Sequence, residues 1–405
     1  MLSRIARLLF LTHEPPCPPT GGARLRNLHL MRELARRGHA VSLLTLVLEE
    51  GLPDAARAEL AGLCERVEAL PFAVGPARRR ARLAADFALG RPYHRRYFLD
   101  RAARGAVRRL AADLRPDALV VAQLYMDVYA REVAAVPAVL DSHNVEERRV
   151  ASMAAAGGPR ALMARRQVGP VARYERAAVA RAARTWAVSD EERLHFERAA
   201  PGRVDLVPNG VDATAVRMRP APAPGADVLF LGRMDYGPNA DGARHLIEDV
   251  LPLVRDPRVV VRVVGTSPPA ALTRLAERAS RPVEVTGFVP ETAPYLAGAR
   301  MLAVSLRSGG GTRLKILEAL AAGVPVVTTS LGGEGIGLRD GHDALVADDP
   351  ASFAAAIDRL AADDALCARL AANGRALVER RFDWSAVGDA AERSLAAVLS
   401  GRPGP

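Results

Sequence analysis

The segment Ser308-Gly-Gly-Gly-Thr-Arg-Leu-Lys-Ile-Leu-Glu318 joins a predicted buried strand, Met301–Leu306, to a predicted helix, Arg313–Ala322. Apolar residues recur along this helix at the spacing of one face, and Gly323 with Pro325 ends it. A strand that passes through a glycine-rich turn into a helix is typical of a parallel sheet whose two faces are covered by helices. The segment therefore predicts an α/β fold.

The glycine loop has the composition of an anion-binding site. Gly309, Gly310 and Gly311 let a ligand approach the backbone N–H groups closely, and Thr312 is predicted to cap the helix that follows. Free N–H groups and the dipole at the start of a helix favour a phosphate. The spacing is not that of a Walker loop, so an ATP- or GTP-hydrolysing site of that type is not predicted.

Lys315 is the only lysine in the sequence, because 55 of the 56 Lys and Arg residues are arginine. An ammonium is a compact charge and a guanidinium is a planar fork, so the two are not interchangeable at a tight anionic site. Lys315 and Glu318 are three apart on the less apolar face of the helix. We interpret Arg313 and Lys315 as charges for a diphosphate and Glu318 as an acceptor for ribose hydroxyls. A surface ion pair is the alternative.

The same alternation of apolar strand and amphipathic helix runs through the chain. Its 405 residues exceed the size of a single core. We predict two doubly wound Rossmann-like domains, residues 1–208 and 209–382, joined near 208–224 and facing a ligand cleft at the carboxyl ends of both sheets. The predicted strands are Ile5–Thr12, Ala40–Val47, Ala118–Gln123, Pro137–Asp141, Arg184–Val188, Asp227–Gly232, Val259–Gly265, Val283–Gly287, Met301–Leu306, Val324–Thr329 and Ala344–Ala347.

Three more candidate positions follow predicted strands at the same edge. Gly21 and Gly22 form a flexible turn after the first strand, and Arg233 follows the first strand of the second half. His143 follows Pro137–Asp141 and can donate, accept or change charge near neutral pH. An ordinary turn, a surface arginine and a loop histidine bonded to the backbone are the respective alternatives.

Composition excludes several classes of protein. No apolar run is long enough to span a membrane, and the apolar N-terminus reads as a strand rather than a signal peptide. Cys17, Cys64 and Cys367 are odd in number and far apart, which predicts a cytosolic protein without disulfides. The sequence has no metal-binding motif of the H-E-x-x-H, Cys/His or D-x-D type, so no metal is predicted. It also has no G-x-S-x-G motif of acyl transfer.

The net charge of +10 is concentrated in two arginine-rich stretches of the first half. Basic, partly amphipathic stretches suit an anionic membrane surface. Nucleic acid is disfavoured as a partner because no binding motif accompanies the charge. Solvated helices are the alternative. The arginines are Arg78, Arg79, Arg80, Arg82, Arg91, Arg95, Arg96, Arg160, Arg165, Arg166, Arg173, Arg176, Arg181 and Arg184.

Seven short motifs are spread over nearly the whole length. They are Thr20-Gly-Gly22, Pro137-Ala-Val-Leu-Asp-Ser-His143, Val207-Pro-Asn-Gly-Val-Asp212, Phe230-Leu-Gly-Arg233, Val285-Thr-Gly-Phe288, Gly309-Gly-Gly-Thr-Arg-Leu-Lys-Ile-Leu-Glu318 and Phe382-Asp-Trp384. In their order and spacing the chain resembles the GT-B-fold glycosyltransferases of family 4, which use nucleotide sugars.

The resemblance implies transfer of a sugar from a nucleoside diphosphate sugar to a hydroxyl of a glycan or lipid-linked acceptor, with retention, without a metal and with no cofactor besides the donor. It implies that the glycine loop and helix bind the donor diphosphate. It places Glu318 at the ribose, Phe288 by the base and His143 near the reacting sugar. Residues 383–405 would cross back to the first domain. The expected location is cytoplasmic, either free or on the inner face of the membrane.

Two positions depart from the family pattern. The first glutamate of the E-x7-E pair is replaced by Gly310, and the lysine expected six residues after Arg233 is Asn239. We infer that Lys315 supplies the charge that Asn239 lacks. The change at Gly310 leaves the donor sugar and the stereochemical outcome open. A nucleotide-sugar epimerase of the same fold and a non-catalytic partner subunit are the other interpretations.

Overall fold

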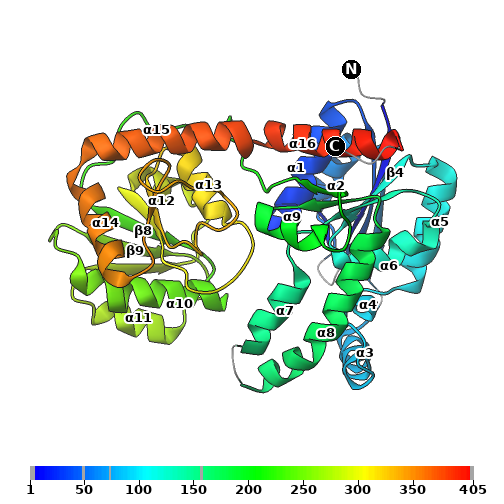
Figure 1. Cartoon of the computed structure of the whole chain (residues 1–405), viewed down its shortest axis with the longest axis horizontal. Helices are drawn as coiled ribbons and strands as arrows, with labels where there is room; N and C mark the ends of the chain where they lie inside the picture. Colours follow the sequence, from blue (N-terminus) through cyan, green and yellow to red (C-terminus); the bar gives the residue numbers. More distant parts are fainter. Residues whose placement is uncertain (1–4, 48–50, 73, 156–157, 402–405) are drawn as a thin grey trace. The chain divides into compact units, whose positions relative to one another are not determined.

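A computed structural model describes residues 5–47, 51–72, 74–155 and 158–401 (Figure 1). The chain divides into two compact units. Unit 1 is Met1–Pro208 with Val387–Pro405, and unit 2 is Asn209–Ala386. Each unit is built around a parallel sheet of its own. The predicted α/β class with two doubly wound sheets is therefore confirmed.

The sheet of unit 1 has the strand order β3-β2-β1-β4-β5-β6-β7, and all its pairs are parallel. Its central strands are apolar along almost their whole length because helices cover both faces. The strand order reverses between β1 and β4, which opens a crevice beyond their carboxyl ends. The strands are β1 (Arg7–Thr12), β2 (Ala40–Val47), β3 (Arg66–Pro71), β4 (Ala118–Ala122), β5 (Ala138–Asp141), β6 (Arg184–Ala187) and β7 (Val204–Leu206).

The first helix of unit 1 follows the predicted pattern. Leu28, Met31 and Leu34 form a fully buried stripe, and the chain leaves the helix through Gly38, whose φ of +93° favours glycine. The helices are α1 (Gly22–Arg36), α2 (Asp54–Leu63), α3 (Pro76–Ala88), α4 (His94–Tyr97), α5 (Arg101–Leu114), α6 (Asp127–Ala130), α7 (Glu146–Ala155), α8 (Gly158–Arg181) and α9 (Asp190–Glu197).

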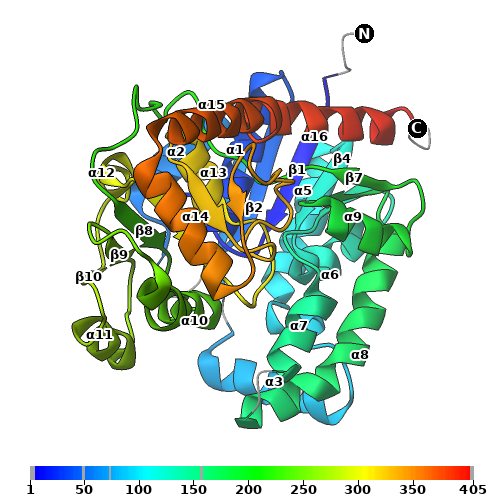
Figure 2. The same ribbon diagram turned by 60° about the vertical axis from the view of Figure 1, so that its left-hand side comes forward.

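Three of these helices, α3, α7 and α8, extend together away from the sheet (Figure 2). α7 and α8 pack along each other, and α3 packs against α8. Gln167 of α8 ties down the segment after α3, because its amide accepts from Tyr93 N at 3.1 Å and donates to Arg91 O at 3.1 Å. The three helices thus form one packed projection of unit 1.

The last helix, α16 (Trp384–Leu399), completes unit 1 from the other end of the chain. The Trp186 indole donates to Ser394 Oγ at 2.8 Å, and His39 Nε2 lies 2.6 Å from Glu392 Oε2. An ion pair joins Arg37 to Asp389 at 2.5 Å. Unit 1 therefore depends on two segments that are far apart in sequence.

The sheet of unit 2 has the parallel order β10-β9-β8-β11-β12-β13, which reverses between β8 and β11. Its strands are β8 (Asp227–Leu231), β9 (Val260–Val264), β10 (Val283–Gly287), β11 (Met301–Val304), β12 (Val326–Thr328) and β13 (Leu345–Val346). The covering helices are α10 (Gly237–His245), α11 (Ala270–Glu277), α12 (Ala293–Gly298), α13 (Leu314–Ala321), α14 (Pro350–Ala362) and α15 (Asp364–Arg381).

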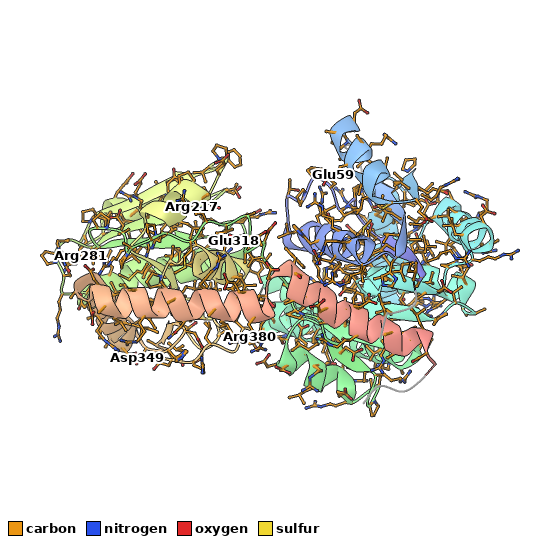
Figure 3. The ribbon with its side chains drawn as sticks, turned by 90° about the horizontal axis from the view of Figure 1, so that it is seen from above. Glu59, Arg217, Arg281, Glu318, Asp349 and Arg380 are labelled. Atoms are coloured by element: carbon orange, nitrogen blue, oxygen red, sulfur yellow. The ribbon has the colours of Figure 1, made fainter. Side chains whose placement is uncertain are left out.

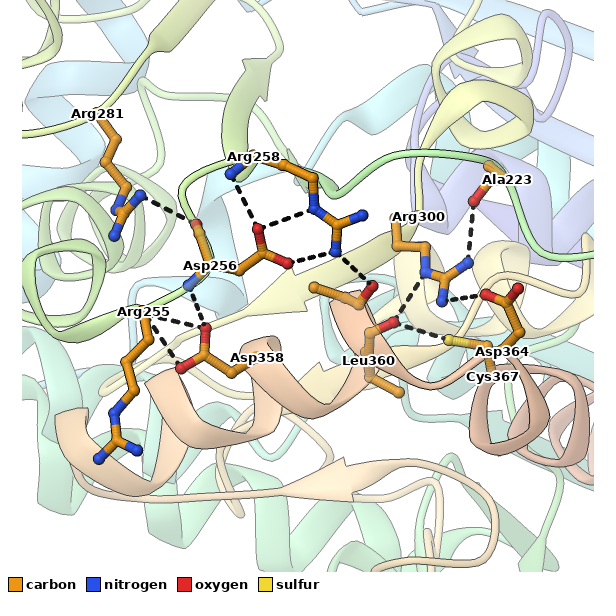
Figure 4. A network of polar contacts seen from close by, with 11 residues as sticks. Ala223, Arg255, Asp256, Arg258, Arg281, Arg300, Asp358, Leu360, Asp364 and Cys367 are labelled. Carbon is orange, nitrogen blue, oxygen red and sulfur yellow. Dashed lines mark hydrogen bonds and ion pairs between the residues drawn. The ribbon is translucent and has the colours of Figure 1, made fainter.

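A buried arginine ties the corner between α14 and α15 to the sheet of unit 2 (Figure 4). Arg300 is 3% exposed and donates to Leu360 O at 2.8 Å and to Ala223 O at 3.1 Å. It also pairs with Asp364 at 2.6 Å. The Cys367 thiol donates to the same Leu360 carbonyl. Main-chain carbonyls that would otherwise be buried without partners are satisfied in this way.

The three cysteines, Cys17, Cys64 and Cys367, are buried and form no disulfide with one another. Within the described ranges, no helix combines the length and the apolar character needed to cross a bilayer.

Candidate active site

In unit 2 the predicted donor-binding residues other than Phe288 follow the two strands between which the strand order reverses. β8 leads through Gly232 to Arg233, and β11 leads through the glycine loop to α13. Ligands of open parallel sheets bind beyond the carboxyl ends of the strands that flank such a reversal. The topology therefore brings Arg233 and Lys315 to the same edge of the sheet, although they are far apart in sequence.

Two of the three loop glycines have a backbone conformation that favours glycine. The φ angle is +101° at Gly309 and +83° at Gly311. A Cβ added at Gly310 would meet no atom within 4 Å. The fold therefore leaves room for a side chain at position 310, and the missing glutamate is not a steric consequence of the loop.

The prediction that Thr312 caps the helix is wrong. α13 begins at Leu314, and Arg313 holds the cap position without a side-chain cap bond. Thr312 lies one residue too early for its hydroxyl to reach the first free N–H groups of the helix. That hydroxyl is buried and has no hydrogen-bond partner among the described residues.

Arg313 is 8% exposed, and only part of its guanidinium is satisfied. Its Nη1 donates to Gly311 O, whereas Nε and Nη2 are buried without a partner among the described residues. Burial lowers the pKa of this guanidinium. Buried donors without acceptors are rare because they lose their hydration without compensation. A ligand with several acceptor oxygens would satisfy them.

Lys315 crosses the end of β8. Its Nζ donates to Asn239 Oδ1 at 2.9 Å and lies 4.9 Å from the centroid of the Phe230 ring. A Cβ added at Gly232 would lie 2.6 Å from Asn239 Nδ2 and 2.9 Å from Lys315 Nζ, so a larger residue there would displace both side chains. Burial lowers the pKa of Lys315 to about 7; Arg313 adds to this shift and Glu318 opposes it. The structure thus places the lysine beside the position where the family pattern expects one.

Glu318 follows Lys315 by three positions on α13 (Figure 3), and its side chain is half-buried between buried neighbours in the helix. Burial raises the pKa of its carboxyl group, and the charge of Lys315 opposes that rise. The short helix α13 therefore provides the site with both a cationic group, Lys315, and an acidic group, Glu318.

The other two donor-site candidates are more exposed. Arg233 is paired with its neighbour Asp235 at 2.6 Å, while Asn239 Nδ2 donates to the Arg233 carbonyl at 2.9 Å. Phe288 follows β10 and is 73% exposed. It lines a separate hollow with Thr286. The structure therefore brings the backbone of Arg233 together with Lys315, whereas Phe288 follows β10, two strands away from β8 in the same sheet.

In unit 1, His143 sits in a buried polar cluster that the sequence did not reveal. Its Nε2 lies 3.0 Å from Asp141 Oδ2, and both side chains are buried. Arg26 of α1 pairs with Asp141 at 2.6 Å and donates to the carbonyls of Val207 and Pro208 at 2.8 Å. Arg26 and His143 together hold the pKa of Asp141 well below its ordinary value, against the effect of burial.

The second ring nitrogen of His143 is also engaged. Nδ1 lies 2.9 Å from the Gln123 side-chain amide. Gln123 follows β4 and has a φ of +69°, a strained conformation for a residue other than glycine. Because a carboxylate only accepts, Nε2 donates to Asp141. His143 therefore contacts a ligand through Nδ1 only if Gln123 gives up its bond.

A cavity of about 630 Å³ adjoins this cluster. Gln123 and Asn144 line it, and so does His13, which follows β1. The cavity therefore lies at the reversal of the unit 1 sheet, between the ends of β1 and β4. Burial lowers the pKa of His13 to about 4, with opposing and reinforcing effects from Glu14 and His143. Its Nδ1 is buried without a partner among the described residues.

The glycine pair near the first strand is exposed. Gly21 is the residue before α1 and has an extended backbone, and a Cβ added there would meet no atom within 4 Å. Gly22 is the first residue of α1 and is also exposed. Gly21 therefore shows no steric need for glycine, and the pair leaves the start of α1 accessible.

One cluster in unit 1 has the composition of a metal site. Ligand atoms of Glu147, Glu175 and His195 lie within 4.8 Å of one another. Glu175 already accepts from the backbone N–H groups of Glu146 at 2.7 Å and Glu147 at 3.2 Å, at the start of α7. Burial raises the pKa of Glu175 to about 8, against these two bonds. The bonds give the carboxyl group a structural role at the helix terminus.

Family profiles match both units. A glycosyl transferase 4-like domain matches residues 21–210, and the glycosyl transferases group 1 domain matches residues 225–363. The chain belongs to glycosyltransferase family 4. The resemblance noted in its motifs is thereby confirmed, and the family is one of enzymes with the GT-B fold.

Two similar proteins are named after inositol compounds. The chain is 35% identical over 215 residues to phosphatidyl-myo-inositol mannosyltransferase of Mycobacterium tuberculosis, covering 50% of this chain and 56% of that one. It is 29% identical over 288 residues to D-inositol 3-phosphate glycosyltransferase of Rhodococcus opacus, covering 64% and 62%. The matched part thus spans little more than half the length of these relatives.

The fold is shared with a solved structure. Anabaena HepE, determined in complex with UDP and glucose, aligns with a TM-score of 0.68 at 17% identity, over 97% of this chain and 100% of that chain. At this identity the likeness shows the GT-B fold alone.

Proposed function

We propose that the protein transfers a glycosyl group from a nucleoside diphosphate sugar to a hydroxyl acceptor, with retention of configuration and without a metal. The observation that carries the proposal is the group of unsatisfied and weakly solvated donors at the start of α13. Among the described residues, Arg313 has two buried nitrogens without partners, Thr312 has a buried free hydroxyl, and Lys315 is a cation in a site that disfavours its charge. A diphosphate would compensate all three.

In this proposal the chain's own groups act on the leaving diphosphate. Charge grows on the diphosphate oxygens as the glycosidic bond to the sugar breaks, and fixed donors stabilise that charge more in the transition state than in the ground state. Lys315 and the N–H groups of α13 would provide those donors, and Glu318 would accept from the ribose hydroxyls. His143 would contact the reacting sugar.

Donor breakdown without an acceptor tests the proposal. The protein is incubated with UDP- and GDP-sugars, and products are separated by chromatography. Slow release of free sugar with the nucleoside diphosphate supports a transferase. A 2-epimer would instead indicate an epimerase, and the absence of turnover and of nucleotide binding would indicate a non-catalytic subunit.

Replacing Lys315 by Met is expected to weaken UDP or GDP binding by about 1–3 kcal/mol, roughly 5- to 150-fold in Kd. The substitution keeps the length and the apolar stem of the side chain and removes the charge. Lys315→Arg should restore the affinity only in part, because the larger guanidinium meets Gly232 and Asn239. Calorimetric titration measures both, and unchanged affinity in the Met variant would contradict the assignment.

The contribution of Lys315 to nucleotide affinity is expected to depend on pH. The pKa of Lys315 falls from 10.5 to about 7 on folding, so the free protein carries this charge at pH 6 and has largely lost it at pH 8. A bound diphosphate favours the protonated form, so binding above pH 7 must take up a proton. The affinity difference between wild type and Lys315→Met should narrow from pH 6 to pH 9. Using the difference cancels the titration of the nucleotide itself.

Glu318→Gln is expected to raise the apparent KM for the donor, on the order of tenfold, with little change in stability. The amide keeps the shape of the side chain but replaces one acceptor by a donor. Glu277→Gln, an exposed change on α11, is the matched control. Equal donor KM in the two variants would remove Glu318 from the donor site.

The arginine-rich stretches support a proposed contact with anionic lipid, though only some of the arginines are available. Arg184 is a buried strand residue, and Arg96 and Arg181 pair with Asp86 and Asp127. The side chain of Arg160 lies outside the described residues. The exposed members besides Arg181 are Arg78, Arg80, Arg91, Arg95, Arg165, Arg166, Arg173 and Arg176.

Changing Arg78, Arg80, Arg91 and Arg95 together to Gln is expected to abolish most sedimentation with anionic vesicles at low salt. Each basic group near such a surface contributes about 1 kcal/mol, screened by salt. Four exposed arginines of unit 2 give a control with the same charge change: Arg274, Arg278, Arg369 and Arg380. Equal recovery of both variants, or of the wild type on neutral vesicles, would favour solvated helices.

A further inference from the structure

The cavity of unit 1 has an unusual composition for this chain. Of its 18 Phe, Tyr and Trp residues, five line this one cavity: Phe87, Tyr93, Tyr97, Phe98 and Tyr125. Aromatic side chains present large apolar faces, so their concentration gives this cavity an apolar surface.

The cavity is polar at its inner end. Glu146 is buried, the His13 side chain is 12% exposed, and Gln123 links this end to His143. Arg149 lies beside them, paired with Glu146 at 2.6 Å and bonded to Tyr125 Oη at 3.2 Å. This end can therefore hold a polar group; His13 Nδ1 is buried here and has no partner among the described residues.

The outer wall of the cavity is made of apolar side chains. Its residues come from α3, α7 and α8: Leu83, Phe87, Val150, Met153, Met163 and Ala164. A sugar placed against this wall would leave its hydroxyls without partners, at a cost for each. A hydrocarbon chain has no such groups, and flexible methionines adapt to its shape.

The mouth of the cavity is also apolar. Met153 and Met163 are 47% and 46% exposed although they line the cavity, so the cavity opens to the surface between α7 and α8. Leu89 follows the last residue of α3, and Leu162 precedes Met163 on α8; they are 58% and 59% exposed. The helices α3, α7 and α8, which extend together from unit 1 (Figure 2), thus carry exposed apolar side chains as well as those that line the cavity.

We infer that this cavity binds the first part of the hydrocarbon chain of an amphipathic, lipid-linked acceptor, whose hydroxyl-bearing end lies at His13 and Gln123 and whose chain leaves between Met153 and Met163. The identification of the ligand as the acceptor rests on the proposed glycosyl transfer. It selects a lipid-linked acceptor over a soluble polysaccharide. The acceptor end then lies beside the His143 cluster.

Two glucosides that differ only in their alkyl chain test the inference. n-Octyl β-D-glucoside, kept below its micelle concentration, should bind the wild-type protein in a calorimetric titration, whereas methyl β-D-glucoside should bind at least tenfold more weakly. Met153→Gln and Met163→Gln should each weaken octyl glucoside binding about three- to tenfold. Both residues are half exposed, so these variants are expected to fold.

Leu194→Gln is the matched control, because Leu194 is 59% exposed on α9 and does not line the cavity. Equal binding of the two glucosides, or equal losses in the control and the methionine variants, would overturn the inference. The titration contains no donor, so its result is independent of turnover. Donor breakdown without chain-dependent binding would reject this cavity alone, whereas chain-dependent binding with neither donor breakdown nor nucleotide binding would reject the transferase assignment.

Discussion

Replacing His143 by Ala is expected to lower kcat by a factor of about 100 to 10,000, the range in which positioned acid–base and hydrogen-bonding groups contribute. The apparent KM for the donor should change much less, because the proposed contact to the sugar strengthens in the transition state. Steady-state kinetics with the donor and acceptor identified by the assays above provide the measurement. Wild-type kcat in the variant would leave His143 a purely structural residue.

A substitution at Gln123 distinguishes a catalytic role of His143 from a purely structural one. Gln123→Ala removes the partner of His143 Nδ1 and leaves the bond between His143 and Asp141 in place. If His143 must exchange that partner for the sugar, this variant should keep far more of the activity than His143→Ala. A circular dichroism spectrum and an unfolding curve for each variant show whether the loss comes from catalysis or from folding.

Arg26→Leu is expected to lower the free energy of unfolding by about 3–5 kcal/mol. Arg26 and Asp141 are both 1% exposed, so the substitution leaves a carboxylate buried without its cation. It also removes the donors to the carbonyls of Val207 and Pro208. Denaturant unfolding followed by circular dichroism measures the loss.

Two further variants show whether that loss of stability comes from the buried Arg26–Asp141 pair. Arg32→Leu lies on the same helix and breaks the half-exposed pair with Glu59, so it should cost less than about 1 kcal/mol. Adding Asp141→Asn to Arg26→Leu removes the uncompensated charge and should recover part of the lost stability. A loss in Arg26→Leu no larger than that in Arg32→Leu would show that the buried pair contributes little.

Most of the fold could be predicted because its central strands are long apolar runs bounded by turns. β1, β2 and β8 lie close to their predicted positions. Two strands at the edges of the unit 1 sheet were missed. β3 is only half-buried and alternates charged with apolar residues, and β7 has three residues. Short or half-exposed edge strands lack the continuous apolar run on which the prediction depended.

The candidate site was predictable where one segment holds it and not where several segments meet. Lys315 and Glu318 share a helix, so their spacing already placed them together. Arg26 and Asp141 are separated by 115 positions. The sequence also does not indicate which of the 55 arginines is buried. His13 and Gln123 are near each other only because β1 and β4 are neighbours in the sheet. The composition of a single segment does not reveal which distant strand it pairs with.

The position of α16 bears on how the protein is made. During translation, residues 1–208 are synthesised long before the segment that carries Glu392 and Ser394, which contact His39 and Trp186 in unit 1. During that interval the indole of Trp186 and the ring of His39 lack their final partners. Asn209–Ala386 is contiguous and carries no such dependence, so unit 2 can finish folding first although it is synthesised second. Translation order and folding order are therefore expected to be reversed in this chain.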